Sequence, residues 1–489
     1  MIDINKAKQK ILDLAIRGKL TKQHHKDGNI NDEIKYYINN VEIENEFKKN
    51  KKQVKINVIE ELPFDIPKTW SWVRLGNVCS IFGRIGYRGY TKDDIVEDGN
   101  GAISLSPSNL VGFGKMDYSN CTYISWDKYN ESPEIMVNNE DIIIVKTGSS
   151  YGKTGFVSNL QKRATINPQL AILKYLQGNR KYILIILNTV FAKKQLDDFV
   201  LGSAVPTFSQ EDLANLMIPI PPLAEQNRIV EKVEHLFDIL DKIDEAQKTY
   251  QKDKDMLKSK IIEAGIRGKL TKQLKSDGDA KDLYDKIQKE KEKLIKEKKI
   301  RNDKIITSEE LDELFEIPKN WKWCRLGEIT EIERGGSPRP IKSFITFDES
   351  GTNWIKIGDV EKSGKYITKC KEKIIKAAEK HSRKVYPGDF LLTNSMSFGR
   401  PYISKIEGCI HDGWLVIRGN NHIYISDYLY YYLSSQFSYN QFCESASGAT
   451  VDNLNIDKVK NLLFVLPPLA EQKRIVEVIE KILCIINDK

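Results

Sequence analysis

The stretch Pro221-Pro222-Leu223-Ala224-Glu225-Gln226 decides the architecture of this chain, because it recurs letter for letter at residues 467–472. Residues 16–23 likewise return unchanged at 266–273. A third pattern, Phe-x-Ile-Pro followed by Trp-x-Trp-x-Arg-Leu-Gly, also occurs once in each half. The 489-residue sequence is therefore predicted to contain two copies of one unit. A repeat of about 250 residues is a domain with its connector and not a short solenoid repeat.

The connector that begins at the first copy has the apolar spacing of a long helix. From Leu223 the apolar residues alternate in steps of four and three, which is the seam of a coiled coil. The Pro-Pro pair before this seam and Gly268 after it predict one helix of about 43 residues, about 65 Å long. A helix of that length persists only when its apolar seam packs on another element.

The second connector is divided between the two ends of the chain. Its seam starts after residue 467 and stops at Lys489, while residues 7–14 match 257–264 at a constant offset. We therefore expect a cyclic, circularly permuted repeat, in which both half-connectors pack antiparallel to the central helix. An ordinary linker helix with a frayed tail would leave the match at the terminus unexplained. The seam residues expected to hold the coil are Leu223, Ile229, Val233, Leu236, Leu240, Ile475, Ile479 and Ile482.

Two globular regions lie between the connectors. Each combines short β-type runs and Gly- and Ser-rich turns with one helical stretch, 180–199 or 426–444. We predict an α+β fold class, with two pseudo-symmetric α+β domains separated by long antiparallel coiled-coil helices. The predicted division is an N-terminal half-connector 1–25, a linker 26–59, a first domain 60–220, a central connector 221–274, a charged and solvated helical linker 275–311, a second domain 312–466 and a C-terminal half-connector 467–489.

The composition narrows the classes of function. The net charge of +8, from 76 basic and 68 acidic residues, is compatible with nucleic-acid binding without establishing it. The sequence has no signal-peptide pattern and no apolar run of about 18 residues, so we expect a cytoplasmic protein that does not enter a membrane. The seven cysteines include no CxxC pair and only six histidines occur, which argues against a disulfide framework or a metal site.

The repeated connector motif, its division between the chain ends and the two interposed domains together resemble the specificity subunit of type I restriction–modification systems. The resemblance covers essentially the whole chain. It implies two target-recognition domains, each reading one half of an asymmetric, bipartite site in double-stranded DNA. It also implies connectors that set the spacing and dock two methyltransferase (modification) subunits.

The same resemblance implies that the partners carry S-adenosylmethionine for adenine methylation. This chain would then bind no cofactor or metal and have no catalytic residues. A motor-nuclease (restriction) subunit is a further partner that the sequence leaves open, as it does the recognised bases and the spacer length. The alternative from another class is a two-domain protein-binding scaffold on a helical spacer.

Three pairs of matching loops are the predicted DNA-binding elements. The first pair follows the Leu-Gly turn of each domain. Its glycines let the backbone approach a phosphate, and its arginines can donate two hydrogen bonds to guanine. The second pair follows a β-type run and offers hydroxyls, amides and one cation. The third pair, 202–207 and 448–453, is equally compatible with a domain-closing turn. The predicted DNA-binding residues are Arg84, Tyr87, Arg88, Lys146, Thr147, Ser149, Ser150, Tyr151, Lys153, Arg334, Ser337, Arg339, Asn394, Ser395, Ser397 and Arg400.

Other conspicuous stretches are interpreted as structural. Residues 141–154 imitate a strand leading into a phosphate loop, but Thr147 stands where the first glycine is required, and the chain from Gly155 looks extended. Residues 167–170 lack the second proline and the aromatic residue of an adenine-methyltransferase loop. The paired tryptophans of the Trp-x-Trp pattern are expected to be core anchors and not stacking platforms for bases.

Overall fold

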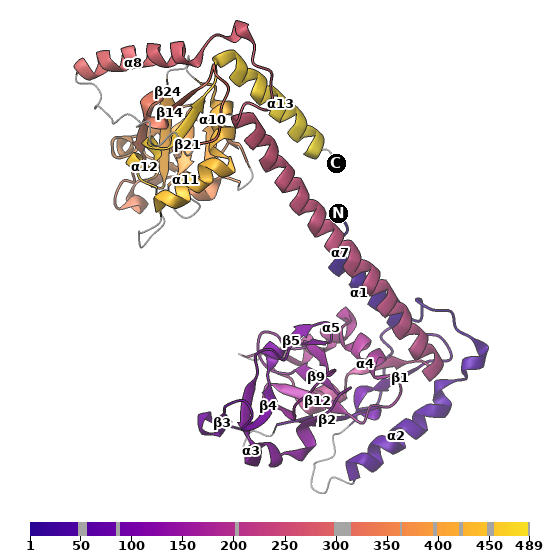
Figure 1. Ribbon diagram of the computed structural model, residues 1–489. Helices are drawn as coiled ribbons and strands as arrows, with labels where there is room; N and C mark the ends of the chain where they lie inside the picture. The colour runs from indigo at the N-terminus through magenta and orange to yellow at the C-terminus, as the bar shows by residue number, and fades with distance from the viewer. Residues whose placement is uncertain are drawn as a thin grey trace. The chain divides into compact units, whose positions relative to one another are not determined.

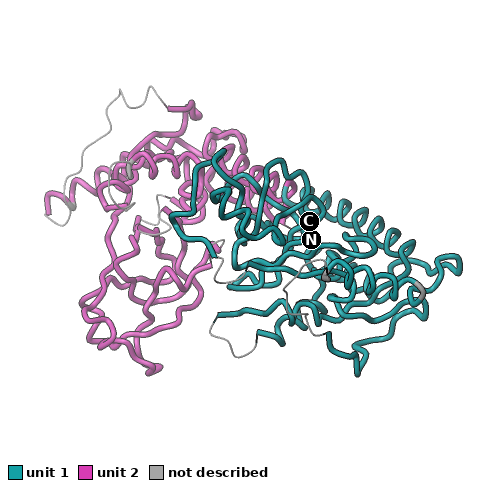
Figure 2. The backbone as a smooth tube through the Cα atoms, turned by 90° about the horizontal axis from the view of Figure 1, so that it is seen from below, with its two compact units in different colours: residues 1–248 teal, residues 249–489 magenta. Residues whose placement is uncertain are grey.

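The computed structural model describes the chain except for residues 47–55, 85–88, 201–204, 298–313, 362–363, 395–398, 420–423, 447–453 and 488–489. The chain forms two compact units, residues 1–248 and 249–489, as Figure 2 shows. The boundary falls inside helix α7 (Leu223–Ile266), which is labelled in Figure 1. Its 44 residues confirm the predicted long helix.

The first unit contains an α+β domain built on two sheets. One sheet has the strand order β10-β9-β12-β2 and is antiparallel throughout. The other has the order β3-β7-β4-β11-β8, with β4 and β11 parallel. The strands are β2 Ser80–Gly83, β3 Ile95–Val96, β4 Gly101–Leu105, β7 Thr122–Ser125, β8 Met136–Val137, β9 Ile142–Val145, β10 Thr154–Phe156, β11 Ala164–Ile166 and β12 Leu170–Lys174.

Two short ribbons and several helices complete this unit. Strand β1 (Ser71–Arg74) pairs with β13 (Met217–Ile220) and so joins the start of the domain to its end. A second ribbon joins β5 (Leu110–Gly112) to β6 (Lys115–Met116). The α-helices before α7 are α1 Ile4–Ile16, α2 Ile30–Glu46, α3 Trp126–Asn130, α4 Arg180–Leu187, α5 Val190–Val200 and α6 Gln210–Ala214.

The second unit repeats this order of elements. Its sheets have the orders β15-β24-β21-β22-β18 and β16-β19-β17-β23-β20, and β14 pairs with β25 as β1 pairs with β13. The strands are β14 Lys322–Arg325, β15 Thr330–Arg334, β16 Ile345–Thr346, β17 Thr352–Ile355, β18 Tyr366–Ile367, β19 Glu372–Ile374, β20 Arg383–Val385, β21 Phe390–Thr393, β22 Pro401–Ser404, β23 Gly408–Ile410, β24 Trp414–Gly419 and β25 Leu463–Leu466. The helices after α7 are α8 Ala280–Lys296, α9 Leu326–Ile329, α10 Ser426–Leu433, α11 Gln436–Ala446, α12 Ile456–Lys460 and α13 Leu469–Asn487.

Each stretch predicted as one helix over 180–199 and 426–444 consists of two helices. In the first unit the Thr189 hydroxyl donates to Ile186 O and accepts from Ala192 N–H, so it ends α4 and begins α5. Ser435 likewise accepts from Ser438 N–H between α10 and α11. A hydroxyl that bonds the backbone in this way competes with the helix, which explains both breaks.

The half-connectors pack on α7 inside their own units, as predicted. In the first unit α1 runs antiparallel to α7: Ile2 N–H donates to the Gln247 side chain (2.6 Å), and Lys8 pairs with Asp241. In the second unit the Cβ of any residue at position 265 would lie 2.9 Å from Ile479 Cδ1 of α13, so a glycine there permits close packing.

The predicted seam residues differ in how deeply they are buried. Ile229, Val233, Ile475 and Ile479 are at most 2% exposed, whereas Leu236, Leu240 and Ile482 are half-buried. Leu223, the first residue of α7, is 41% exposed. The buried members belong to the hydrophobic core of their own unit, and the others leave part of the seam accessible.

The repeated letters of the sequence meet in one hydrogen-bonded cluster per unit, which we call the connector hub. The buried Glu225 carboxylate accepts from Trp70 Nε1 (2.8 Å), Gln23 Nε2 (2.9 Å) and the Thr21 hydroxyl (3.2 Å). In the second hub Glu471 accepts from the equivalent side chains, which are Trp321 (2.8 Å), Gln273 (3.0 Å) and Thr271 (3.0 Å). The hub explains why three separate stretches are duplicated together.

The neighbouring glutamine and arginine of the repeated motif extend the hub. Gln226 accepts from Asn179 N–H (2.8 Å) and donates to Pro221 O (2.8 Å), which ties α7 to the start of α4. Arg228 forms an ion pair with Asp27 (2.5 Å), and Arg474 forms the same pair with Asp277 (2.6 Å). Each tryptophan of the hub is at most 5% exposed and belongs to the hydrophobic core of its unit, which confirms its predicted role as an anchor.

Two segments predicted as linkers contain packed helices. Within 26–59, helix α2 buries Ile30 and Tyr37 in the core of the first unit. Within 275–311, helix α8 buries Ala280 and Ile287 in the core of the second unit, so it is not solvated on all sides. The two helices occupy equivalent places in the order of elements and extend the duplication beyond the repeated motifs.

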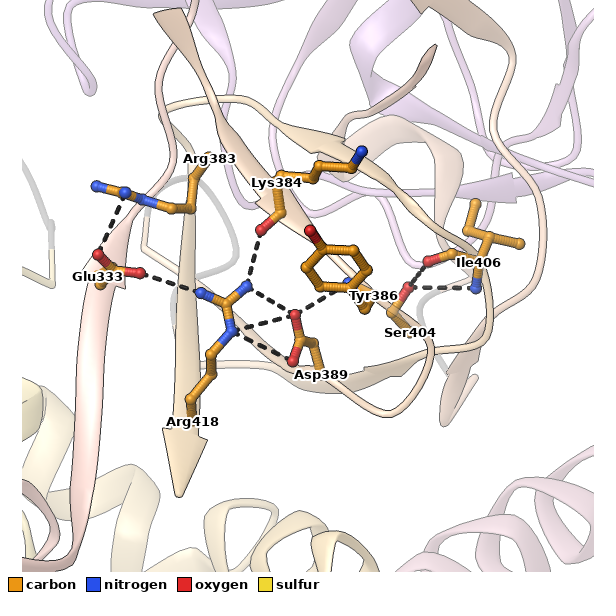
Figure 3. Close-up of polar contacts among 8 residues, drawn as sticks. All are labelled: Glu333, Arg383, Lys384, Tyr386, Asp389, Ser404, Ile406 and Arg418. Carbon is orange, nitrogen blue, oxygen red and sulfur yellow. Dashed lines mark hydrogen bonds and ion pairs between the residues drawn. The ribbon is translucent and has the colours of Figure 1, made fainter. Parts of the chain in front are cut away.

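A cation joins the two sheets of each domain; it is half-buried in the second domain and buried in the first. In Figure 3 the Arg418 guanidinium of β24 donates to Asp389 (2.7 Å) and to Lys384 O of the other sheet (2.7 Å). In the first domain Lys174 of β12 makes the same two contacts, with Asp141 (2.8 Å) and Met136 O (2.5 Å). The surrounding frame of the two domains is therefore conserved in its polar contacts as well as in its strand order.

Candidate nucleic-acid interface

The predicted loops of the second domain converge on the turn between β23 and β24. Asn394, directly after β21, donates its backbone N–H to Gly413 O (2.9 Å) and its side-chain amide to Asp412 O (2.9 Å). Arg334, the last residue of β15, donates Nε to the same Asp412 carbonyl (3.0 Å). Leu454, after the third loop, donates N–H to Asn394 O (3.0 Å). Segments far apart in the sequence thus share one end of the sheet.

The Asp412 side chain collects further predicted residues at this end. Its Oδ1 accepts from the Ser337 hydroxyl (2.8 Å), and its Oδ2 lies 3.9 Å from Arg339 Nη2. Burial raises the Asp412 pKa, but the Ser337 hydroxyl and neighbouring positive charges outweigh it, and the net pKa is lowered. Asp412 is therefore ionised at neutral pH. Arg339 is 86% exposed and is available to a ligand.

The first domain gathers its loops on the matching turn between β11 and β12. Lys146 donates N–H to Gln169 O (2.8 Å), and Phe208 donates N–H to Lys146 O (3.1 Å). The Thr147 hydroxyl bonds that of Thr207 (2.8 Å) and so joins the second predicted loop to the third. The described part of the third stretch therefore lies beside the second loop.

Arg84 has a different position from the other predicted arginines. It is 3% exposed, and its guanidinium donates to Ile166 O (3.0 Å) and to the Thr165 hydroxyl (3.1 Å). Burial lowers its pKa from the ordinary value for arginine. The same backbone position in the second domain is served by Gly336 N–H, which donates to Ile410 O (3.1 Å). The Arg84 guanidinium is thus bound to strand β11 and is not exposed to a ligand.

The rest of the second loop in the first domain is more accessible. Ser149 and Ser150 are exposed, and Lys153 is half-buried. The Tyr151 hydroxyl donates to Asp197 (2.7 Å), and the Lys193 ammonium lies 3.2 Å from the centre of the Tyr151 ring. Burial lowers the pKa of Lys146. This loop therefore offers hydroxyls at its tip and cations at its base.

In the second domain Arg400 lies at the end of the second loop. Its backbone N–H donates to the Thr393 hydroxyl (3.0 Å), and its side chain lines a cavity of about 300 Å³ with Tyr430 and Tyr439. Four of the predicted residues lie outside the described part of the chain: Tyr87, Arg88, Ser395 and Ser397.

Sequence reasoning missed the turns at the centre of these loops. Gln169 falls in the stretch interpreted as lacking the features of an adenine-methyltransferase loop, and the His411-Asp412-Gly413 turn belongs to no predicted motif. The available signal was a polar turn between two apolar runs in the same place in both copies. Asp197, which holds Tyr151, gave no signal because it lies on a helix remote in sequence.

The stretch that imitates a phosphate loop is a β-hairpin. Strands β9 and β10 pair antiparallel, with Thr154 opposite Ile144, so no helix follows the glycines. This confirms the extended structure expected from Gly155 onward. Among the described residues, no cluster of three or more His, Cys, Asp or Glu side chains has the arrangement of a metal site. In that same part of the chain, no helix is long and apolar enough to cross a membrane.

Comparisons with known proteins agree with this architecture. The family model of the type I restriction modification DNA specificity domain matches residues 67–251 and 318–488. The specificity subunit of the type I restriction enzyme EcoAI of Escherichia coli is 28% identical over 68% of this chain and 63% of its own length. That of EcoEI, also from Escherichia coli, is 24% identical over 98% of this chain and 88% of its own length.

One solved structure supports the fold independently of close sequence similarity. It comes from work on complex assembly and conformational transition of the type I R-M system, and it superposes with a TM-score of 0.61 at 20% identity. The superposition covers 87% of this chain and 93% of the other. The fold is thus that of two α+β domains separated by a long helix. The chain belongs to the family of type I restriction–modification DNA specificity subunits.

Proposed function

We propose that this chain supplies the sequence specificity of a type I restriction–modification complex, and that each α+β domain reads one half of a bipartite, asymmetric DNA site. The observation that carries the proposal is the division of each unit into a duplicated hub and diverged loops. Glu225 and Glu471 have the same three partners, whereas the loops that meet at Gln169 and Asp412 differ in sequence. A constant frame with variable loops suits two readers of different base sequences.

The chemistry of the loops suits contacts with DNA. Exposed hydroxyls and backbone amides can position phosphates, and a planar guanidinium can bond two acceptors on guanine. Arg339 and Arg334 lie at the loop end of the second domain with only part of their hydrogen-bonding capacity used by Asp412. Arg334, Ser337, Arg339, Asn394 and Arg400 are the proposed contacts there.

In the first domain the proposed contacts come mainly from the second loop, because Arg84 is buried. Lys146, Thr147, Ser149, Ser150, Tyr151 and Lys153 surround the hairpin turn between β9 and β10. Tyr87 and Arg88 remain proposed contacts on sequence grounds.

The connectors are proposed to hold the two readers at a fixed spacing and to dock two methyltransferase subunits. Readers on one face of a duplex must lie whole helical turns apart, about 34–36 Å per turn. Those partners would bind S-adenosylmethionine and methylate adenine, so the chain itself would be non-catalytic and would act in the cytoplasm. A motor-nuclease subunit is a further proposed partner.

Selection from a random duplex library tests this function. The chain is incubated with the library at several salt concentrations, with and without its cognate methyltransferase subunit. Binding should select two short conserved blocks at a constant gap, more strongly with the partner, and should weaken as salt rises because phosphates are contacted. Failure to bind any duplex at every salt concentration would support the protein-binding scaffold instead.

A further inference from the structure

The two connectors present an equivalent glutamate to their domains, nine residues after the glutamate of each hub. These residues are Glu234 of α7 and Glu480 of α13. Residues 181 and 427 face them from equivalent helices, α4 and α10. The first of these is Lys181, but the second is Asp427. The duplication therefore places opposite charges together in one unit and like charges together in the other.

In the first unit the contact is direct. The Lys181 ammonium lies 2.6 Å from Glu234 Oε1, and both side chains are about half exposed. Beside this pair, Phe113 packs edge-on against Phe237 of α7, with ring centroids 4.8 Å apart. Exposed ion pairs contribute little, about 0.2–1 kcal/mol, whereas an aromatic contact adds about 0.5–1.5 kcal/mol beyond its buried area. The aromatic pair is the stronger part of this attachment.

In the second unit a lysine, Lys365, pairs with both carboxylates. The Lys365 ammonium lies 2.5 Å from Asp427 and 2.7 Å from Glu480, and the Lys365 side chain is only 14% exposed. Three tyrosine rings surround it, at 4.9 Å for Tyr431 and 5.4 Å for Tyr366 and Tyr430. Burial lowers the Lys365 pKa, but the two carboxylates outweigh this and raise it above its usual value. The lysine is therefore charged at physiological pH.

The backbone shows which residue Lys365 replaces. Its carbonyl accepts from Ile403 N–H of β22 (3.0 Å), as the Gly114 carbonyl accepts from Phe156 N–H of β10 (2.7 Å) in the first domain. A Cβ at position 114 would lie 2.6 Å from Leu184, so that position has no room for a lysine. The edge of each domain thus reaches its connector at the same place, with Phe113 in one case and Lys365 in the other.

We propose that Lys365 is a positioning residue that fixes the second recognition domain on its connector by bridging Asp427 of α10 and Glu480 of α13. Each domain carries its own complement to the same connector glutamate: Lys181 on a helix in the first, Lys365 on a strand edge in the second. At this glutamate the second domain makes a buried ionic contact, whereas the first combines an exposed ion pair with an aromatic contact beside it. Where the proposed function holds, this contact also sets the direction in which the second domain meets DNA.

Hydrogen exchange on the full chain bound to its cognate methyltransferase subunit tests the bridge without DNA. K365M leaves Asp427 and Glu480 facing each other without a cation. Loss of charge-assisted bonds of this kind should speed exchange in α10 and in the outer part of α13 by about ten-fold. The central strands β21 and β24 should keep their protection. K181M in the first unit is the matched control, and it should leave exchange in α4 within about two-fold of the wild type, as an exposed pair predicts.

A rescue variant separates positioning from general loss of packing. K365G/D427K copies the Gly114 and Lys181 of the first unit and restores an opposite charge to Glu480. We expect it to recover most of the protection lost in K365M. Exchange that stays fast in K365G/D427K, or that is unchanged in K365M, would overturn the proposal.

The DNA readout distinguishes this inference from the function on which it rests. If the function holds, K365M should weaken selection of one half-site or make the length of the gap variable. Selection of the other half-site should be unchanged. If no duplex is selected by the wild type but K365M still loosens α10 and α13, the function fails and the bridge stands. Selection that is normal in K365M despite fast exchange would show that the bridge does not orient the reader.

Discussion

At one equivalent place in the two domains, Arg84 donates its guanidinium to Ile166 O, and Gly336 donates its backbone N–H to Ile410 O. Both contacts satisfy a carbonyl next to the turn on which the loops converge. The first domain uses a buried arginine for this purpose, whereas the second uses the Gly336 N–H and the Ser382 hydroxyl (2.8 Å). Arg334 and Arg339 of the second domain take no part in this contact and lie near the surface. The frame is thus constant, and the residues left over for a ligand differ between the domains.

Exchange of a whole domain should change the recognised DNA sequence more than any single substitution. Replacing residues 60–220 by the recognition domain of another family member removes every loop of the first reader and leaves the second unit untouched. We expect complete replacement of one selected half-site and no change in the other. Selection from a random duplex library measures both halves at once. A change in both half-sites would contradict one reader per domain.

Substitution of the hub glutamate should lower the stability of the two units equally, because the two hubs make the same contacts. E225L removes a buried carboxylate and leaves the donors of Trp70, Gln23 and Thr21 without an acceptor. We expect a loss of about 3 kcal/mol in the free energy of unfolding of the first unit. Urea unfolding followed by hydrogen exchange would assign the loss to that unit.

E471L is the matched variant of the second hub and should cost its unit the same within about 1 kcal/mol. E225Q and E471Q keep an acceptor and should lose less than the leucine variants. A loss confined to one copy would show that the two hubs are not equivalent.

Substitutions in the turns on which the loops converge should affect DNA affinity differently in the two domains. D412A removes the acceptor of Ser337 and the charge beside Arg339. We expect about ten-fold weaker binding of the complex to its DNA site, through the second half-site alone, as for one misplaced bidentate contact. Its counterpart in the first domain is Pro168, and P168A should leave affinity unchanged. Equal effects of the two substitutions would argue against a role of the carboxylate.

The last two substitutions distinguish an arginine buried against β11 from an exposed arginine that can bind DNA. R84M should lower the free energy of unfolding by about 2 kcal/mol, because Ile166 O and the Thr165 hydroxyl lose a buried donor. R339A should leave stability within about 0.5 kcal/mol, because the side chain is exposed. Binding should weaken more for R339A than for R84M once the folded fraction is taken into account. Thermal unfolding and titration with the selected duplex measure the two quantities.

The sequence predicted best the elements whose motifs are repeated in both halves of the chain. The seam after Leu223 predicted α7 and the packing of α1 on it, and the Trp-x-Trp pattern predicted the anchors Trp70 and Trp321. Three loops per domain were predicted from matching positions, and the strands bring the described parts of these loops together at Gln169 and Asp412.

The remaining features depend on tertiary contacts that spacing does not reveal. An arginine in a Gly-rich loop is expected to be exposed. Arg84 is buried because its guanidinium contacts strand β11, which its sequence context does not indicate. The breaks at Thr189 and Ser435 depend on the direction of a hydroxyl within an apolar helical pattern. The bridge by Lys365 joins residues separated by 62 and 115 positions and belongs to no motif.

The central claim is that the duplicated frame carries two different readers on one chain. Mapping methylated adenines in the DNA of cells that contain this chain and its methyltransferase partner tests it most directly. We predict methylation at one bipartite sequence, with two unlike blocks separated by a gap of constant length. Methylation at a single continuous sequence, or a pattern unchanged when this chain is absent, would contradict the claim.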